Sequence, residues 1–170
     1  MNPLDRIVRG GLAALVCFSG PVSAGLFSDP DPNWQEGAYE MPAAPSNATL
    51  HGFFVSAASP NQFLIDTESL TVGEDGVVRY VLVVRTPGGA ENVTFEGIRC
   101  DVGGWRIYAS GRATGEWSPA RDIGWQPITD TDYNRSRSAL AKEFFCDGPA
   151  PPRDRDEVLR RVRDTGRIVR

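Results

Sequence analysis

The chain has few of the residues on which metal binding and nucleophilic catalysis usually depend: of its 170 residues, one is a histidine and three are cysteines. The histidine, His51, has no histidine or cysteine partner at metal-ligand spacing, so neither a zinc motif nor a Ser-His-Asp triad is recognisable. The glycine-rich segments 86–89 and 101–104 lack Walker spacing and are typical of hairpin turns. The sequence therefore predicts no catalytic residue, no metal and no cofactor.

Long hydrophobic runs are also missing. The apolar run Gly11–Phe18 has about half of the ~20 residues that a membrane-spanning helix needs. It follows Arg6 and Arg9 and precedes the small residues Val22-Ser23-Ala24, which is the arrangement of a signal peptide. We expect residues 1–24 to be a signal peptide that is cleaved after Ala24. The mature chain would then be a soluble periplasmic protein with no transmembrane segment.

An alternative is a lipoprotein anchored through Cys17, because this cysteine lies at the end of the apolar run. The lipoprotein peptidase requires a very small residue directly before the cysteine. Val16 is bulky, which disfavours this alternative.

Positive charge is scarce in the main part of the chain. Residues 25–152 contain nine basic and seventeen acidic residues, whereas residues 153–170 contain seven arginines and four acidic residues. An acidic body cannot gain affinity from phosphates, so binding to nucleic acid is not expected.

Cleavage after Ala24 would leave two cysteines, Cys100 and Cys146. In an oxidising compartment this pair predicts a disulfide, worth about 3–4 kcal/mol for a loop of about 46 residues. A redox-active pair is disfavoured because such cysteines usually lie close together as Cys-x-x-Cys.

The mature chain divides into three predicted parts. Residues 25–48 are rich in proline and are expected to form an extended arm, anchored by Trp34 and Tyr39. Residues 49–150 carry the strand and helix patterns of an α+β domain, and residues 151–170 form a basic C-terminal helix.

Alternating and β-branched segments with short turns between them predict an antiparallel meander of about five to seven strands. The strongest segment, Val77–Arg85, is expected to be buried on much of both faces. The other expected strands are His51–Val55, Phe63–Ile65, Ser69–Val72, Asn92–Asp101 and Trp105–Ser110.

Two helices are expected near the end of the chain. Asn134 can cap a helix from Arg135 to Phe145, which the disulfide at Cys146 would tie to the sheet. A second helix should begin near Asp154 and end before Gly166. Its apolar stripe is narrow, so we expect weak docking.

Two sets of side chains are candidates for function. Aromatic and arginine residues are frequent at binding hot spots, although core packing is the more common use. The candidate binding patch consists of Trp105, Tyr108, Trp117, Arg121 and Trp125. Two carboxylates facing one cleft could instead cleave a glycosidic bond. The carboxylates considered for this are Asp66, Glu68, Glu96 and Asp101.

Several segments, above all Phe95-Glu96-Gly97-Ile98-Arg99-Cys100, resemble the family of exported proteins named after the cryptic neisserial protein. The resemblance also covers the segments 63–80, 87–93, 117–121 and 144–146. It implies a small exported protein of Gram-negative bacteria, periplasmic and often regarded as a lipoprotein. The family has no assigned activity, so it supplies no catalytic residue.

The expected function is therefore a non-enzymatic binding module of the cell envelope whose partner is an envelope protein or a glycan. The alternative is a carboxylate-dependent hydrolase that acts on envelope polysaccharide.

Overall fold

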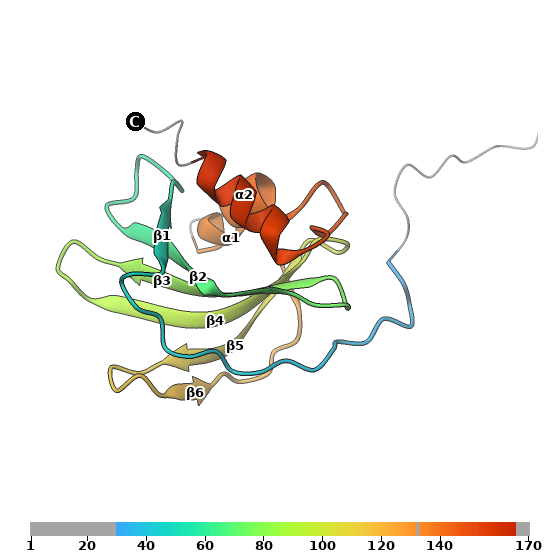
Figure 1. Cartoon of the computed structure of the whole chain (residues 1–170), viewed down its shortest axis with the longest axis horizontal. Coiled ribbons are helices and arrows are strands. Elements are labelled where there is room, and N and C mark those ends of the chain that lie inside the picture. The colour runs from blue at the N-terminus through green and yellow to red at the C-terminus, as the bar shows by residue number, and fades with distance from the viewer. Residues whose placement is uncertain (1–29, 132, 166–170) are drawn as a thin grey trace, which may run out of the picture.

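The computed structural model describes residues 30–131 and 133–165. The predicted signal peptide 1–24, its cleavage site at Ala24 and the alternative anchor at Cys17 lie outside the described residues, as do residues 166–170. The described chain forms a sheet with helices on one face and an extended arm on the other (Figure 1). No described helix is long and apolar enough to cross a membrane.

The described strands form a single antiparallel sheet, which confirms the predicted meander. The first six are neighbours in sequence order, and β7 pairs with β5 on the same edge as β6. Short turns force this order because they cannot make a parallel crossover. The strands are β1 (Leu50–Phe53), β2 (Gln62–Val72), β3 (Val77–Arg85), β4 (Glu91–Arg99), β5 (Gly104–Gly111), β6 (Trp117–Pro119) and β7 (Gln126–Pro127).

The second strand departs from the prediction of two short strands at Phe63–Ile65 and Ser69–Val72. It is one strand of 11 residues, β2, whose register against β3 shifts between Asp66 and Thr71. Asp66 and Ser69 hold this bulge, because the Asp66 Oδ2 accepts the Ser69 N–H at 3.0 Å and the Ser69 hydroxyl donates to the Asp66 carbonyl at 3.0 Å. Local side-chain bonds of this kind let a strand continue through an irregularity.

The helices cover one face of the sheet, which we call the helix face (Figure 1). The predicted helix 135–145 is present as α1 (Arg135–Leu140) followed by a π-helical turn, η1 (Ala141–Phe145). Asn134 precedes it but does not cap it through its side chain, because the Asn134 Oδ1 accepts no hydrogen bond from the helix. Its Nδ2 group donates to the Thr129 hydroxyl at 3.1 Å. The second helix is α2 (Arg155–Thr165).

The expectation of weak docking for α2 is wrong. Val158, Leu159 and Val162 are all buried in the same core cluster as the sheet residues Tyr80 and Ile98. These three side chains lie on one side of α2, and they are enough here because η1 and β2 enclose them. The helix layer is therefore a firm part of the domain.

The predicted disulfide between Cys100 and Cys146 is present, with its Cα atoms 5.5 Å apart. It joins the chain just after β4 to the residue that follows η1. Disulfides persist mainly in oxidising compartments, which indicates an extracytoplasmic protein.

Residues 30–48 cross the opposite face of the sheet, which we call the arm face (Figure 1). The Trp34 indole N–H donates to the Asp75 carbonyl at 2.9 Å, and further along the Trp117 indole N–H donates to the Pro42 carbonyl at 2.7 Å. Tyr39 packs on Tyr108 at a centroid distance of 4.3 Å. The predicted anchors Trp34 and Tyr39 therefore both contact the sheet, and the arm is fastened at separate points along its length.

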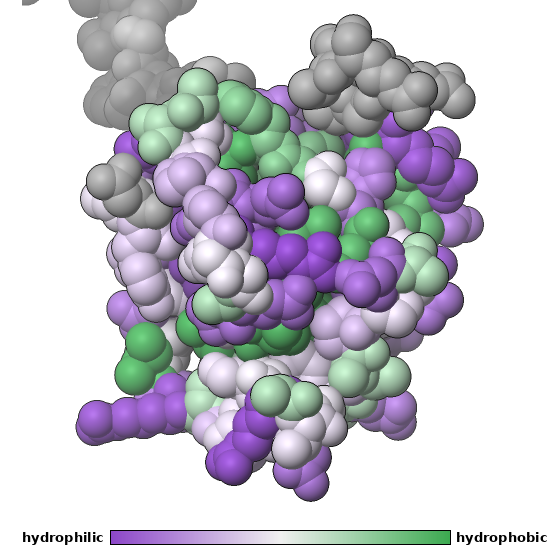
Figure 2. Space-filling model, turned by 90° about the vertical axis from the view of Figure 1, so that its left-hand side faces the viewer, coloured by the Kyte–Doolittle hydropathy of each residue, from purple (hydrophilic) through white to green (hydrophobic). Residues whose placement is uncertain are grey.

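The end of the molecule that carries the turn between β3 and β4, on the left in Figure 1, has a mixed surface. Figure 2 shows hydrophobic residues there in separate patches between hydrophilic ones. This view therefore shows no single continuous apolar face of the kind that would dominate association.

Candidate functional site

Glu36 fastens the arm to the middle of the arm face. One of its carboxylate oxygens accepts hydrogen bonds from the Tyr108 hydroxyl at 2.6 Å and from Arg79 at 3.4 Å, and the other accepts from Arg106 at 2.6 Å. Burial of Tyr108, followed by its bond to Glu36, raises the pKa of the Tyr108 hydroxyl, so this group remains a hydrogen-bond donor. Three donors from two strands thus converge on one residue of the arm.

Beside Glu36, Arg79 and Asp75 form a buried ion pair with an N–O distance of 2.6 Å. Burial opposes ionisation of Asp75, but hydrogen bonds from Arg79 and from the backbone N–H groups of Gly37 and Val77 outweigh it and lower the pKa of Asp75. The Gly37 N–H belongs to the arm and lies 2.8 Å from the Asp75 Oδ2. The same carboxylate therefore neutralises Arg79 and holds the arm.

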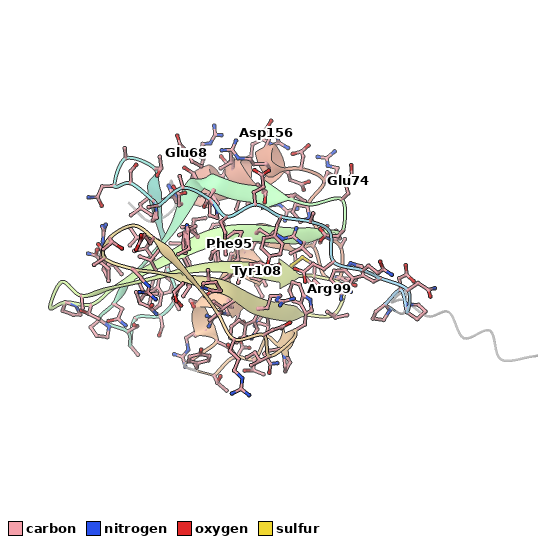
Figure 3. All side chains as sticks on the ribbon, turned by 90° about the horizontal axis from the view of Figure 1, so that it is seen from below. Glu68, Glu74, Phe95, Arg99, Tyr108 and Asp156 are labelled. Carbon is pink, nitrogen blue, oxygen red and sulfur yellow. A yellow bond between two sulfur atoms is a disulfide. The ribbon has the colours of Figure 1, made fainter. Side chains whose placement is uncertain are left out.

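A glycine in β4 makes room for the tyrosine of this site. A Cβ atom added at Gly97 would lie 2.5 Å from the Tyr108 hydroxyl oxygen, closer than real contacts allow. In Figure 3, Tyr108 and Phe95 lie side by side on the sheet face that the arm crosses. Gly97 belongs to the distinctive segment Glu96–Cys100, and its lack of a side chain has a direct structural use.

The arm does not lie flat on the sheet beyond Gly37. Between residues 38–46 of the arm and strand β2 there is a cleft of about 700 Å³, which we call the arm cleft. Tyr39 and Met41 line it from the arm, and Asp66, Glu68 and Arg79 line it from the sheet. A cavity of this volume is within the range of small-molecule binding sites.

Asp66 is a polar residue of the arm cleft that lacks a full set of partners. Its exposed fraction is 3%, and its Oδ1 has no hydrogen-bond partner. Its Oδ2 is bonded to the Ser69 N–H, which fixes the orientation of the carboxylate. A buried carboxylate oxygen without a donor costs free energy, so such an atom beside a cleft is a candidate for binding a ligand. The Oδ1 atom is itself enclosed, so a donor from outside the chain reaches it only if neighbouring groups of the cleft move. The Nε of Arg79, in the same cleft, also lacks a partner.

The helix face holds a further buried carboxylate, Glu96, with an exposed fraction of 0%. It accepts hydrogen bonds from Tyr80 at 3.0 Å and Thr94 at 2.7 Å, and two from Arg137, at 2.9 and 2.6 Å. Burial and the neighbouring Glu96 charge raise the pKa of Tyr80 well above its usual value. This carboxylate is completely satisfied by the protein and joins α1 to the sheet.

The predicted aromatic and arginine patch is not brought together on one surface. Trp105 is buried on the helix face, where the guanidinium of Arg137 lies 3.8 Å from its ring centroid. Tyr108 and Trp117 pack against Phe95 on the arm face. Because Trp105 and Tyr108 are three residues apart in one strand, their side chains point to opposite faces.

The other two residues of that set do not join a common patch either. Trp125 packs edge-on against Trp34 with a centroid distance of 6.0 Å. Arg121 is exposed in the segment between β6 and β7. The tryptophans that were grouped from the sequence thus serve three different contacts.

The four candidate carboxylates also lie at different places in the fold. Glu96 is enclosed on the helix face, whereas Asp101 pairs with Arg99, whose guanidinium stacks on the arm residue Trp34. Glu96 and Asp101 therefore do not face a common cleft. Asp66 and Glu68, in contrast, both line the arm cleft.

A larger and more apolar groove of about 750 Å³ lies beside the edge strand β1. It is lined by Phe53, Phe63 and Phe144, and His51 is at its margin. Among the described residues, no cluster of three or more His, Cys, Asp or Glu side chains could hold a metal ion.

Sequence reasoning named Asp66 as one carboxylate among several and did not detect the arm cleft. A signal for Asp66 was available. It lies two residues after Leu64 in the apolar run Phe63-Leu64-Ile65, so strand alternation places this carboxylate on the same face of the sheet as an apolar side chain. No comparable signal identifies Glu36 or Arg137, whose partners are 41 to 72 residues away along the chain.

Comparison with known proteins agrees with the resemblance seen in the sequence. Cryptic neisserial protein 1 of Neisseria gonorrhoeae is 26% identical over 153 residues, which cover 80% of this chain and 75% of that protein. No solved structure matches the fold. The model of the CNP1-like family matches residues 29–163, and because this is most of the sequence, the chain belongs to the CNP1-like family.

Proposed function

We propose that this chain is a non-enzymatic binding module of the cell envelope, located in the periplasm, and that the arm cleft holds its ligand. The observation that carries the proposal is the Oδ1 of Asp66, a buried acceptor without a partner in a cleft of about 700 Å³. A ligand that donates to this atom recovers the free energy that its burial costs.

The construction of the cleft supports this role. One wall is the rigid sheet, with Asp66 oriented by its bond to Ser69. The other wall is the arm, which is held at Gly37 on one side of the cleft and at Pro42 within it. Point attachments of this kind allow the arm to adjust around a ligand while the sheet keeps its geometry.

Native mass spectrometry would test the proposal. The purified mature protein is incubated with the low-molecular-weight fraction of its own envelope and then transferred to volatile buffer. Wild type should retain a bound mass, and the Asp66→Asn variant should lose it, because the amide keeps the bond to Ser69 but replaces the free acceptor with a donor.

Asp156→Asn is the matched control, because Asp156 is exposed on α2 and is not part of the arm cleft (Figure 3). This variant should retain the same mass as wild type. The proposal is overturned if wild type retains no mass, or if Asp66→Asn retains it equally well.

A hydrolase remains the second candidate, because Asp66 and Glu68 line one cleft. The test is release of reducing ends from envelope polysaccharide by wild type and by the Asp66→Asn and Glu68→Gln variants. Cleavage by wild type that both variants lose would favour the hydrolase. Retention of a ligand without cleavage would favour the binding module.

A further inference from the structure

The charged residues of the arm cleft are mostly acidic. Glu40, Asp66 and Glu68 line it together with one basic residue, Arg79. Glu40 and Glu68 are exposed at its margins, and Asp66 is buried. The electrostatic potential inside the cleft therefore depends on whether the charge of Arg79 is available to balance that of Asp66.

The charge of Arg79 is already balanced by two other carboxylates. Its terminal nitrogens bond to both oxygens of Asp75, at 2.6 and 3.2 Å, and one of them approaches Glu36 at 3.4 Å. These two carboxylates belong to the network that fastens the arm, and Arg79 and Asp75 are both buried. Arg79 is therefore neutralised locally and does not compensate the carboxylate of Asp66.

The chemistry that suits Asp66 is a cationic hydrogen-bond donor. Hydrogen bonds between an ionised donor and a carboxylate are shorter and about twice as strong as neutral ones. Attraction between opposite charges is also several times stronger in a partly buried site than in bulk water. A hydroxyl donor would satisfy the bonding geometry of Oδ1 but would leave its charge unbalanced.

The aromatic wall of the cleft suits the same kind of group. Tyr39 lines it from the arm, and Phe95, which is almost completely buried, lies beneath it. The Tyr39 ring packs on Tyr108 and has the Arg79 guanidinium 5.3 Å from its centroid, so a ligand contacts the 43% of Tyr39 that is still exposed. Aromatic faces attract organic cations and also pack against the alkyl carbons next to an ammonium group.

We infer that the ligand of the arm cleft carries a positively charged amine, such as an alkylamine or an amino sugar, whose N–H donates to the Oδ1 of Asp66. This inference rests on the proposed function, because it names the ligand class of the same site. Glu68 and Glu40 attract the amine at the entrance of the cleft, and Asp66 binds it inside.

Three probes of equal length and different charge can test this inference: 1,5-diaminopentane, 1,5-pentanediol and glutarate. Each is titrated into isotope-labelled protein while the backbone amide resonances are followed by NMR. The diamine should shift the amides of Ser69 and Thr71 in a saturable manner, and the diol and the dicarboxylate should not. Asp66→Asn should weaken binding of the diamine by about tenfold or more.

Asp156→Asn removes the same charge outside the cleft and should bind the diamine as wild type does. Glu68→Gln should weaken binding less than Asp66→Asn, because Glu68 is exposed to solvent. The inference is overturned if the diamine shifts no cleft amide, or if Asp66→Asn binds it as tightly as wild type.

If the diol bound as tightly as the diamine, the inference that the ligand must carry a charged amine would also be overturned. If that binding were lost in Asp66→Asn, the arm cleft would still be a ligand site, for a neutral hydroxyl compound. The proposed function is judged separately by the envelope-fraction experiment, so the two ideas can fail independently.

Discussion

Two buried carboxylates on opposite faces of the sheet, Glu96 and Asp66, differ in how completely the protein satisfies them. On the helix face, Glu96 accepts four hydrogen bonds and is paired with Arg137. On the arm face, Asp66 is almost as deeply buried and keeps one oxygen without a partner. The first carboxylate joins two layers of the structure, whereas the second has one oxygen that no group of the described chain satisfies.

The covers of the two faces differ in the same sense. The helix layer is joined to the sheet by a continuous apolar cluster and by the disulfide. The arm has no regular secondary structure and is held by separate polar contacts, at Trp34, Glu36, Gly37 and Pro42. The comparison teaches that one face is closed by continuous packing, whereas the other is covered by a segment that is attached at separate points.

Breaking the ion pair of the helix face should have the largest effect. Arg137→Met leaves Glu96 buried without its cationic partner, which costs about 3–5 kcal/mol. Urea denaturation would measure the loss. The double variant Glu96→Gln/Arg137→Met should recover part of it, because no unpaired charge remains. Equal losses in the single and double variants would contradict the role of the charge.

Opening the disulfide should cost nearly as much. For residues separated by 46 positions, the Cys100→Ser/Cys146→Ser variant should lose about 3–4 kcal/mol of the free energy of unfolding. Wild type should show the same loss when a reductant is added, and the variant should be insensitive to the reductant. A reductant effect on the variant would point to a different cause.

Crowding Tyr108 should loosen the arm face by a smaller amount. The added methyl group of Gly97→Ala displaces the Tyr108 ring and weakens the bond between its hydroxyl and Glu36, at a cost of about 1–3 kcal/mol. Hydrogen exchange of the arm amides should increase. Gly89→Ala is not a suitable control because Gly89 has a φ of 84°. Gly88→Ala is the better control. Gly88 lies next to Gly89 in the turn between β3 and β4, and a Cβ atom added there would meet nothing closer than 3.9 Å, so this variant should leave the exchange of the arm unchanged.

Acid should loosen the attachment of the arm at Gly37. The pKa of Asp75 is below its ordinary value of 3.8 in the folded chain, so its ionised form stabilises the fold. That contribution is complete above pH 3.8 and is lost as the pH falls through the lowered pKa. The Gly37 amide resonance, followed by NMR over this range, should report the change. In Asp75→Asn this transition should disappear.

The smallest effect on stability is expected for Asp66→Asn, and this variant tests most directly whether Asp66 differs from Glu96. Asp66→Asn should not lower the free energy of unfolding, because the amide keeps the bond to Ser69 and removes a buried charge that has no partner. Its urea denaturation curve should coincide with that of wild type or shift to higher urea. A marked destabilisation would show that Asp66 has a structural partner, and the case for a ligand at this atom would fail.

The fold was largely predictable because its signals are local. The Asp75-Gly76 pair predicts a tight hairpin, and Gly76 adopts a φ of 75°. The run Val77–Arg85 is β-branched and aromatic, and the corresponding strand β3 is buried from Val77 to Val83. The β2 bulge could not be foreseen, because it depends on Asp66 and Ser69 bonding to each other instead of ending the strand.

The candidate site was less predictable. The five aromatic and arginine residues were grouped by composition, and strand alternation places Trp105 and Tyr108 on opposite faces. The narrow stripe of α2 suggested weak docking, although Val158 and Val162 are completely enclosed by other elements. Both errors arise where the burial of a residue is decided by segments distant in the chain.

The sequence by itself determined most of the strands, the meander order and the disulfide partners, because residue type, turn chemistry and the number of cysteines leave few alternatives. Only the tertiary structure decided that Arg137 satisfies Glu96 and that the arm crosses the other face to leave Asp66 in a cleft. These relations join residues such as Glu36 and Tyr108, which are 72 positions apart. Their physical cause is the way whole layers pack, and no local pattern encodes it.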